Sequence, residues 1–153
     1  MSTISLDTFD FDSAIRWHLD QVRKSRAPTG LFTASAPDVT TGYNKAWLRD
    51  IYFMTLGFKY TGEWDVVQDA ARALLKILEK HKDKITWVVG NKPYETWQFI
   101  HARYNPETFE EYWEEWGNKQ HDAVGEVLYL IADCETSGHS VIQAEADTAL
   151  VRM

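Results

Sequence analysis

The sequence is poor in cysteine and lacks long apolar runs, and both absences exclude classes of protein. Its one cysteine, Cys134, supports neither a disulfide framework nor a cysteine-rich zinc site. No stretch approaches the roughly 18 consecutive apolar residues that a membrane-spanning helix needs. The opening segment "MSTISLDTFDFD" is acidic and has neither the basic nor the apolar region of a signal peptide. We therefore expect a cytoplasmic protein without membrane contact.

Positive charge is also scarce, because 16 Lys and Arg residues stand against 23 Asp and Glu residues, for a net charge of −7. Nucleic-acid binding requires a basic face, so we expect no nucleic-acid partner. Aromatic residues, in contrast, are abundant, with 7 Trp, 7 Tyr and 7 Phe among 153 residues. Large rings commonly fill cores, but Trp and Tyr also offer flat apolar faces with one polar group. Such faces suit a neutral ligand such as a sugar.

The hydrophobic pattern predicts an all-α chain. Apolar residues recur at helical spacing in segments that we expect to be about five helices, at residues 12–27, 44–60, 63–81, 122–134 and 142–153. Asp10 or Asp12 is the expected N-cap of the first helix and Asn44 that of the second. Between the third and fourth helices, β-favouring residues flank the turn Asn91-Lys92-Pro93, which predicts a short β-hairpin near 85–104.

Two of these helices are apolar on most of their surface. A helix of this kind needs neighbours on most of its faces, and helices 44–60 and 122–134 are both of this kind. Five helices offer little cover for two of them. We therefore expect the chain to belong to a larger helical assembly, with exposed helix faces available for self-association.

The segment "TTGYNKAWLRDIYFM", residues 40–54, contains the first candidate site. Helical spacing places Tyr43, Trp47 and Asp50 on one side of the predicted helix. Asp50 only accepts hydrogen bonds, whereas Arg49 donates them from a planar fork. Together they can hold adjacent sugar hydroxyls while a ring supports the sugar's apolar face. The alternative is a structural role, either as an internal Arg–Asp pair or as two charges that are paired elsewhere in a core.

The segment "WEEWGNKQHDAVG", residues 113–125, contains the second candidate site. Trp116, Gln120 and Asp122 stand just ahead of an apolar helix, which is the usual composition of a pocket rim. The alternative is an ordinary helix start, with Asp122 as its N-cap and Gln120 in solvent.

Other reactive side chains give weaker signals. His101 and His121 have no companion ligands at metal-binding spacing, so we expect satisfied or solvated histidines and no metal or cofactor. The glutamates between residues 110 and 115 are typical of a solvated helix start. Cys134 has no neighbouring base and is expected to be a small buried side chain.

Together the two segments resemble the glucoamylase-type glycoside hydrolases of family 15. "GYNKAWLRDIYFMTLGF" is similar to the family's Tyr-x-x-x-Trp-x-Arg-Asp helix, and "EEWGNKQHDAVGEVLYLI", about 70 residues later, is similar to its Trp-Gly-x-x-Gln-x-Asp signature. The same pattern occurs in the helical domain of phosphorylase kinase regulatory subunits. The resemblance implies an incomplete (α/α)6 barrel of the six-hairpin glycosidase type, with residues 1–153 as the N-terminal part of a single domain.

The resemblance also implies an activity, the hydrolysis of α-linked glucans such as maltooligosaccharides with inversion. Two carboxyl groups roughly 6.5–9.5 Å apart perform it, one as acid and one as base. In such enzymes the matching Arg and Asp hold the outer hydroxyls of the non-reducing glucose, and the matching Trp of the second signature stacks near the scissile bond. The implied substrate-binding residues are Tyr43, Trp47, Arg49, Asp50, Trp116, Gln120 and Asp122.

Departures from the family pattern refine this expectation. Asn118 and Lys119 stand where fungal members often carry Arg and Pro, and Ala123 stands where Gly is common, which favours the prokaryotic or kinase-subunit-like branch. The family's acid lies in a later Trp-Glu-Glu, whereas "YWEEW" precedes the second signature here. We therefore expect no catalytic residue in this chain, which would contribute a glucose-binding subsite in carbohydrate metabolism. The alternative is a non-catalytic glucan-binding or regulatory helical domain.

Overall fold

Helices make up most of what the structure describes. The computed structural model describes residues 10–36, 38–40, 42–112, 114, 117 and 119–153. Within these residues lie α1 (Phe11–Arg23), α2 (Leu48–Tyr60), α3 (Trp64–Lys80), α4 (Lys82–Gly90), α5 (His121–Thr136) and α6 (Glu145–Val151). A short 3-10 helix, η2 (Thr96–Gln98), and two short strands, β1 (Ala46–Trp47) and β2 (Arg103–Tyr104), complete the order. The predicted all-α class is confirmed.

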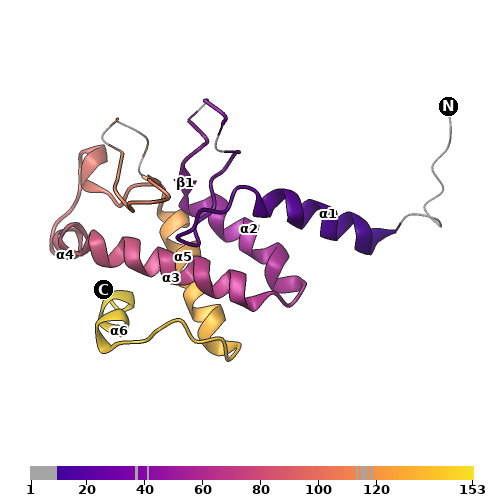
Figure 1. Ribbon diagram of the computed structural model, residues 1–153. Coiled ribbons are helices and arrows are strands. Elements are labelled where there is room, and N and C mark those ends of the chain that lie inside the picture. Colours follow the sequence, from indigo (N-terminus) through magenta and orange to yellow (C-terminus); the bar gives the residue numbers. More distant parts are fainter. Residues whose placement is uncertain (1–9, 37, 41, 113, 115–116, 118) are drawn as a thin grey trace.

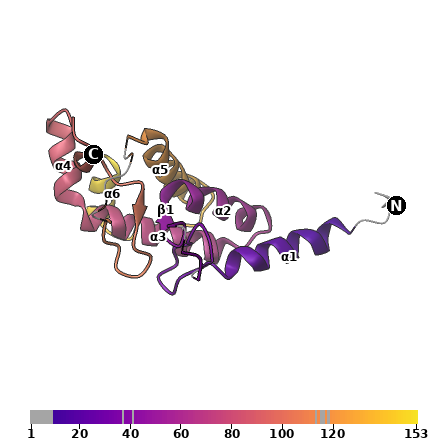
Figure 2. The ribbon, with the colours of Figure 1, turned by 90° about the horizontal axis from the view of Figure 1, so that it is seen from above.

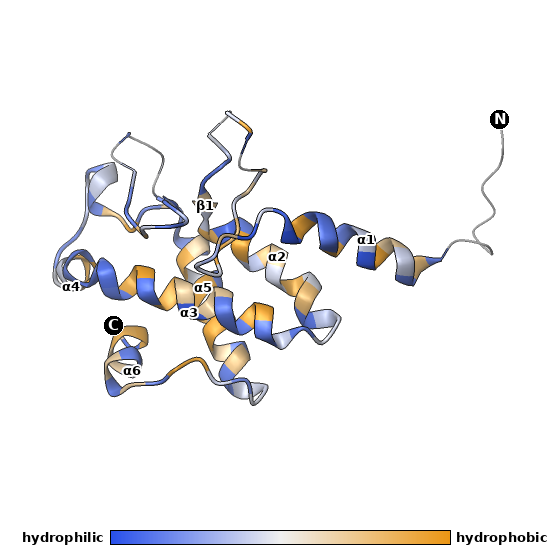
Figure 3. Cartoon of the chain, viewed as in Figure 1, coloured by the Kyte–Doolittle hydropathy of each residue, from blue (hydrophilic) through white to orange (hydrophobic). Residues whose placement is uncertain are grey.

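The core lies where α2, α3 and α5 pack together (Figure 1). Helix α3 contributes a buried stripe that includes Val67, Ala70, Leu74 and Ile77, spaced three or four residues apart as its amphipathic pattern predicts. Seen from above, α2 and α5 lie next to each other on one side of α3 (Figure 2). Apolar residues are concentrated on these three helices (Figure 3).

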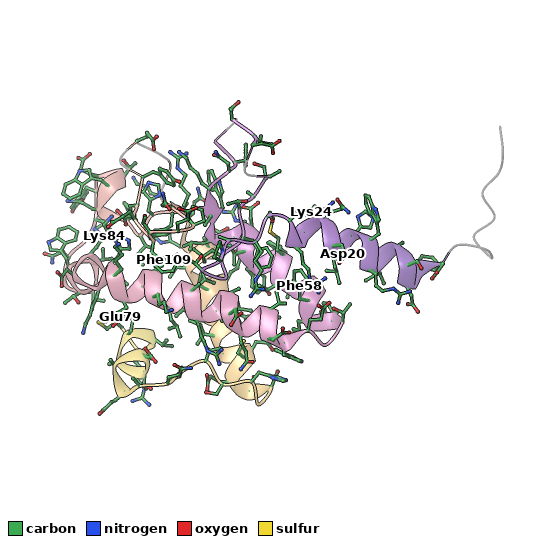
Figure 4. The ribbon with its side chains drawn as sticks, viewed as in Figure 1. Asp20, Lys24, Phe58, Glu79, Lys84 and Phe109 are labelled. Atoms are coloured by element: carbon green, nitrogen blue, oxygen red, sulfur yellow. The ribbon has the colours of Figure 1, made fainter. Side chains whose placement is uncertain are left out.

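The loop that follows α1 packs against this core. Phe58 of α2 points into the interior, where its ring stacks on Phe32 of the loop with centroids 5.6 Å apart (Figure 4). Both side chains are fully buried. Helix α1 itself projects away from the other helices and meets α2 only near its C-terminal half, where Leu19 contacts Gly57 (Figures 1 and 2).

The predicted hairpin near 85–104 is wrong. Residues 82–90 form α4, which follows α3 with only His81 between them, and the Ile85 N–H donates to the His81 carbonyl at 3.2 Å. β propensity depends on pairing with a sheet neighbour, and the sheet in the described part of the chain consists of β1 and β2 alone, so these residues remain helical. Strand β2 pairs instead with β1, antiparallel, with Ala46 opposite Tyr104 and Trp47 opposite Arg103.

The predicted N-terminal boundary is right for α1 and wrong for α2, and α1 ends at Arg23 rather than at residue 27. Asp10 caps α1, and its carboxylate accepts the Ser13 N–H at 3.1 Å. Helix α2 begins at Leu48 rather than after Asn44. The residues between them are extended because they pair with β2, and the Leu48 N–H donates to the Ala102 carbonyl at 3.0 Å.

Gly30, which follows α1, supplies a specific test of the packing between the loop and α3. Its φ of +97° is left-handed, and an added Cβ would lie 2.8 Å from the Asp69 backbone oxygen. Gly62 has a similar φ of +80° but nothing within 4 Å of such a Cβ. Alanine at either position costs about 1–2 kcal/mol through its left-handed conformation. At Gly30 we expect about 1–3 kcal/mol more from the backbone clash.

Urea unfolding of Gly30→Ala and Gly62→Ala measures this difference directly. Equal losses of unfolding free energy in the two variants would contradict the close approach of residue 30 to α3.

Candidate functional site

The site is built on two parallel helices. Lys59 near the end of α2 pairs with Asp133 near the end of α5 at 2.6 Å, and Arg49 at the start of α2 pairs with Asp122 at the start of α5 at 2.5 Å. The two helices therefore run in the same direction, and their N-termini lie together. Helix N-termini carry partial positive charge and free N–H groups, so this end attracts oxygen-rich groups.

Arg49 joins the two predicted sites. Its Nη2 donates to Gln120 Oε1 at 3.1 Å in addition to pairing with Asp122. Gln120 in turn donates from Nε2 to the Gly117 carbonyl at 2.8 Å, which fixes the orientation of its amide. The Arg49 and Asp122 side chains are 45% and 55% exposed, so a ligand can reach both.

Asp122 does not cap α5. Gln120 occupies the N-cap position and makes no side-chain capping bond, while Asp122 lies in the first helical turn. A carboxylate there still benefits from the helix dipole, but its contact is with Arg49 rather than with a backbone N–H of its own helix. The alternative, in which Asp122 caps the helix and Gln120 is simply solvated, does not hold for Gln120 either, because its amide bonds to Arg49.

Asp50 differs from Asp122 in its surroundings. It is partly buried beside a hollow of about 420 Å³ between α1 and α2, lined by Leu19, Val22, Arg49, Asp50, Phe53, Met54 and Gly57. No hydrogen bond or ion pair joins its carboxylate to another residue in the described part of the chain, so the structural Arg49–Asp50 pair does not form. Burial raises the pKa of Asp50 above its ordinary value of 3.8, and the Arg49 charge only partly opposes this.

Tyr43 and Trp47 lie ahead of α2 rather than on it, so the prediction that they share a helical face is wrong. Their rings nevertheless stack, with centroids 5.7 Å apart and planes 23° apart. Tyr43 is 53% exposed and Trp47 is partly buried. The pair forms a flat aromatic surface immediately before the helix that carries Arg49 and Asp50. Trp116 lies outside the described residues.

Sequence reasoning missed two residues near the site. Arg103 lies over the Trp47 ring with its Cζ 5.6 Å from the centroid, and only a long-range strand pairing brings it there. Glu126 lies one turn after Asp122 on α5, and burial, followed by the Asp122 charge, raises its pKa. The four-residue spacing on a predicted helix was the signal that could have found Glu126.

The side chains that gave weaker signals in the sequence, His101, Cys134 and Glu111, differ in their surroundings. His101 is buried, and burial lowers its pKa to about 4, so its Nδ1 is free to accept the Arg103 N–H at 3.2 Å. Cys134 is buried as predicted, and burial raises the pKa of its thiol to about 11, which makes it a poor nucleophile. Glu111 is not solvated, because its side chain is 20% exposed and accepts from Lys84 Nζ at 2.5 Å.

Two negative findings apply to the described residues. Within those ranges no three His, Cys, Asp or Glu side chains are grouped so as to hold a metal ion. In the same part of the chain, no helix has the length and apolar character to cross a membrane.

Comparison of the sequence with models of protein families shows which family contains these motifs. The model of the glycosyl hydrolases family 15 matches residues 17–152, a span that contains both motifs. The chain belongs to glycosyl hydrolase family 15. Comparisons with curated proteins and with solved structures give no significant match. This family-15 chain is therefore a glucoamylase-like glycoside hydrolase domain, and its helical structure agrees with the six-hairpin fold class.

Because its pKa is raised, the ionised Asp50 side chain lowers the free energy of unfolding. The folded state binds the Asp50 proton more tightly than the unfolded state does, so ionisation at neutral pH opposes folding. Asp50→Asn should therefore raise stability at pH 7 by a few tenths of a kcal/mol, roughly 1–2 °C in Tm, a small gain because the group is partly exposed. The gain should disappear as the pH falls through the raised pKa toward 3.8, where the wild-type carboxyl is protonated.

Asp65→Asn is the matched control, because Asp65 is exposed in the first turn of α3 just as Asp50 lies in the first turn of α2. Both variants lose an attraction to a helix dipole, and only Asp50→Asn removes a desolvated charge. Thermal unfolding at pH 7 in which Asp50→Asn is less stable than Asp65→Asn would contradict the interpretation.

Proposed function

We propose that this site binds the non-reducing glucose of an α-linked glucan, as the glucose-binding subsite of an inverting glucoamylase-type hydrolase in carbohydrate metabolism. The observation that carries the proposal is the contact of Arg49 with both Gln120 and Asp122. These residues come from two sequence signatures 71 positions apart, and the fold brings them to one place. A purely structural ion pair needs only one partner for Arg49.

The polar groups suit adjacent hydroxyls. The Asp50 carboxylate has two acceptor oxygens without a partner among the other described residues, and it lies beside the hollow between α1 and α2. Arg49 has five N–H donors, and its two described contacts use only Nη2. An acceptor and a donor on consecutive residues can therefore bind neighbouring hydroxyls of one sugar ring without displacing an existing bond.

The aromatic pair supplies the complementary surface. Tyr43 and Trp47 present stacked rings immediately before the helix that carries Arg49 and Asp50, and the hollow beside Asp50 has apolar walls, including Leu19 and Phe53. A pyranose has polar edges and apolar C–H faces, so it matches a surface with both kinds of group. We include Trp116 among the substrate-binding residues on the family pattern.

Titration with maltose, maltotriose and acarbose, followed by Trp fluorescence and calorimetry, tests the proposal. We expect binding that Asp50→Ala weakens at least about tenfold, since a charged hydrogen bond is worth about 1.5–3 kcal/mol. Asp65→Ala, which removes the equivalent carboxylate of α3, should bind as the wild type does.

Far-UV circular dichroism of both variants guards against misfolding as the cause. If no saccharide gives a signal with a folded wild-type chain, or if both variants weaken binding equally, the proposed subsite is wrong. Capture of a stable protein partner in the absence of saccharide binding would instead favour the regulatory alternative.

A further inference from the structure

Aromatic rings and cations alternate in a column that extends from the proposed glucose site into the protein. The Tyr43 ring stacks on Trp47, Arg103 lies over Trp47 at 5.6 Å, the same guanidinium lies 5.7 Å from the Tyr112 centroid, and Lys45 Nζ lies 3.8 Å from that centroid. We call Tyr43, Trp47, Arg103, Tyr112 and Lys45 the aromatic column. Its outer end is Tyr43, which is 53% exposed.

The middle of the column is held by the backbone. Trp47 and Arg103 are directly opposite each other in the antiparallel β1–β2 pair. The Arg103 N–H donates to His101 Nδ1 at 3.2 Å, and His101 is itself buried. Opposite residues in an antiparallel pair have adjacent side chains, so the strand register brings the guanidinium to the indole.

The charges of the column converge on one carboxylate. Glu114 Oε2 lies 3.5 Å from Lys45 Nζ and 3.5 Å from Arg103 Nη2. The Arg103 side chain is only 6% exposed, whereas Glu114 is 43% exposed. Burying a guanidinium is costly, and a position that served core packing alone would be better filled by an apolar side chain. A buried arginine at this position is therefore expected to act on the side chains that it contacts.

The Arg103 guanidinium lies 5.6 Å from the Trp47 ring centroid and 5.7 Å from that of Tyr112, and so limits the space in which either ring can turn. Arg can stack on an aromatic face and bind a carboxylate at the same time, and the two interactions fix the plane of the guanidinium. Trp47 lies at the N-cap of α2, and the described residues between α1 and β1 form no helix that could orient the ring. The orientation of the indole, and of the Tyr43 ring stacked on it, depends on what contacts its faces.

We propose that Arg103 is a positioning residue, which holds Trp47 and through it Tyr43 in the plane that receives the apolar face of a sugar. This inference rests on the proposed glucan-binding function. Arg103 touches no ligand in this scheme and acts through the indole. It makes the aromatic half of the site depend on β2, a strand 57 residues from its partner along the chain and outside both family signatures.

The test uses a ligand-free readout together with saccharide binding. The near-ultraviolet circular dichroism of the Tyr43–Trp47 stack is defined first, as the difference between the wild type and Tyr43→Leu. Arg103→Lys and Arg103→Gln are then compared with Arg26→Lys, a control in which the replaced arginine pairs with Asp69 at 2.7 Å. Lysine keeps the charge near Glu114 but lacks the planar guanidinium that can stack on an aromatic ring.

We expect both Arg103 variants to lose the difference signal while keeping wild-type far-ultraviolet spectra, and to bind maltotriose about tenfold more weakly, which corresponds to about 1.4 kcal/mol. Arg26→Lys should change neither readout. Retention of the difference signal in Arg103→Lys, or unchanged maltotriose affinity after the signal is lost, would overturn the positioning role. If Arg103→Gln fails to fold, the conservative Arg103→Lys variant decides.

The same measurements separate this inference from the proposed function. If the folded wild type binds no saccharide, the glucan-binding function fails, and the role of Arg103 in binding fails with it. Loss of the difference signal in Arg103→Lys would in that case support only the organisation of the stack.

Discussion

The parallel packing of α2 and α5 is the constraint on which the rest of the structure depends. Ion pairs join the helices at both ends, Arg49 with Asp122 and Lys59 with Asp133. At 1.5 Å per residue, the two pairs are separated by about 15 Å along α2 and about 16 Å along α5, so both fit one side-by-side alignment. Parallel neighbours cannot be joined by a short turn, and α3 with residues 81–120 supplies the return path.

The proposed glucose site has two halves that different parts of the fold support. The polar half, Arg49, Asp50 and Asp122, lies in the first turns of packed helices, and rigid elements fix its geometry. The aromatic half, Tyr43 and Trp47, precedes the helix and relies on the two-residue strand pair and on Arg103. On this proposal the two halves respond differently to substitution, because removing a carboxylate deletes a contact with the sugar, whereas changing β2 alters the orientation of the rings.

The sequence predicts those elements and site residues that a local hydrophobic periodicity or a family signature marks. Helix α3 follows its amphipathic pattern almost to the residue. The family signatures assign Arg49 and Gln120 to one substrate-binding set but do not predict the hydrogen bond between them. The sequence does not predict the pairing of β1 with β2, because a two-residue pairing between distant segments leaves no local pattern. The start of α2 and the position of Arg103 depend on this pairing and are missed for the same reason. Helix α4 is missed because its β-favouring residues have no strand partner and remain helical.

The exposed faces of α2 and α5 connect the site to the prediction of a larger helical assembly. Leu128 and Tyr129 of α5 are 36% and 58% exposed, and Phe53 of α2 is 57% exposed, on the side of α2 roughly opposite its buried Ile51. Phe53 also lines the hollow beside Asp50. An element that covered this face of α2 would close over the proposed glucose site and exclude water from it, which strengthens hydrogen bonds to the partly buried carboxylate. Covering the helices and enclosing the proposed sugar site would then be one event, and it would remove the partly buried Asp50 further from water.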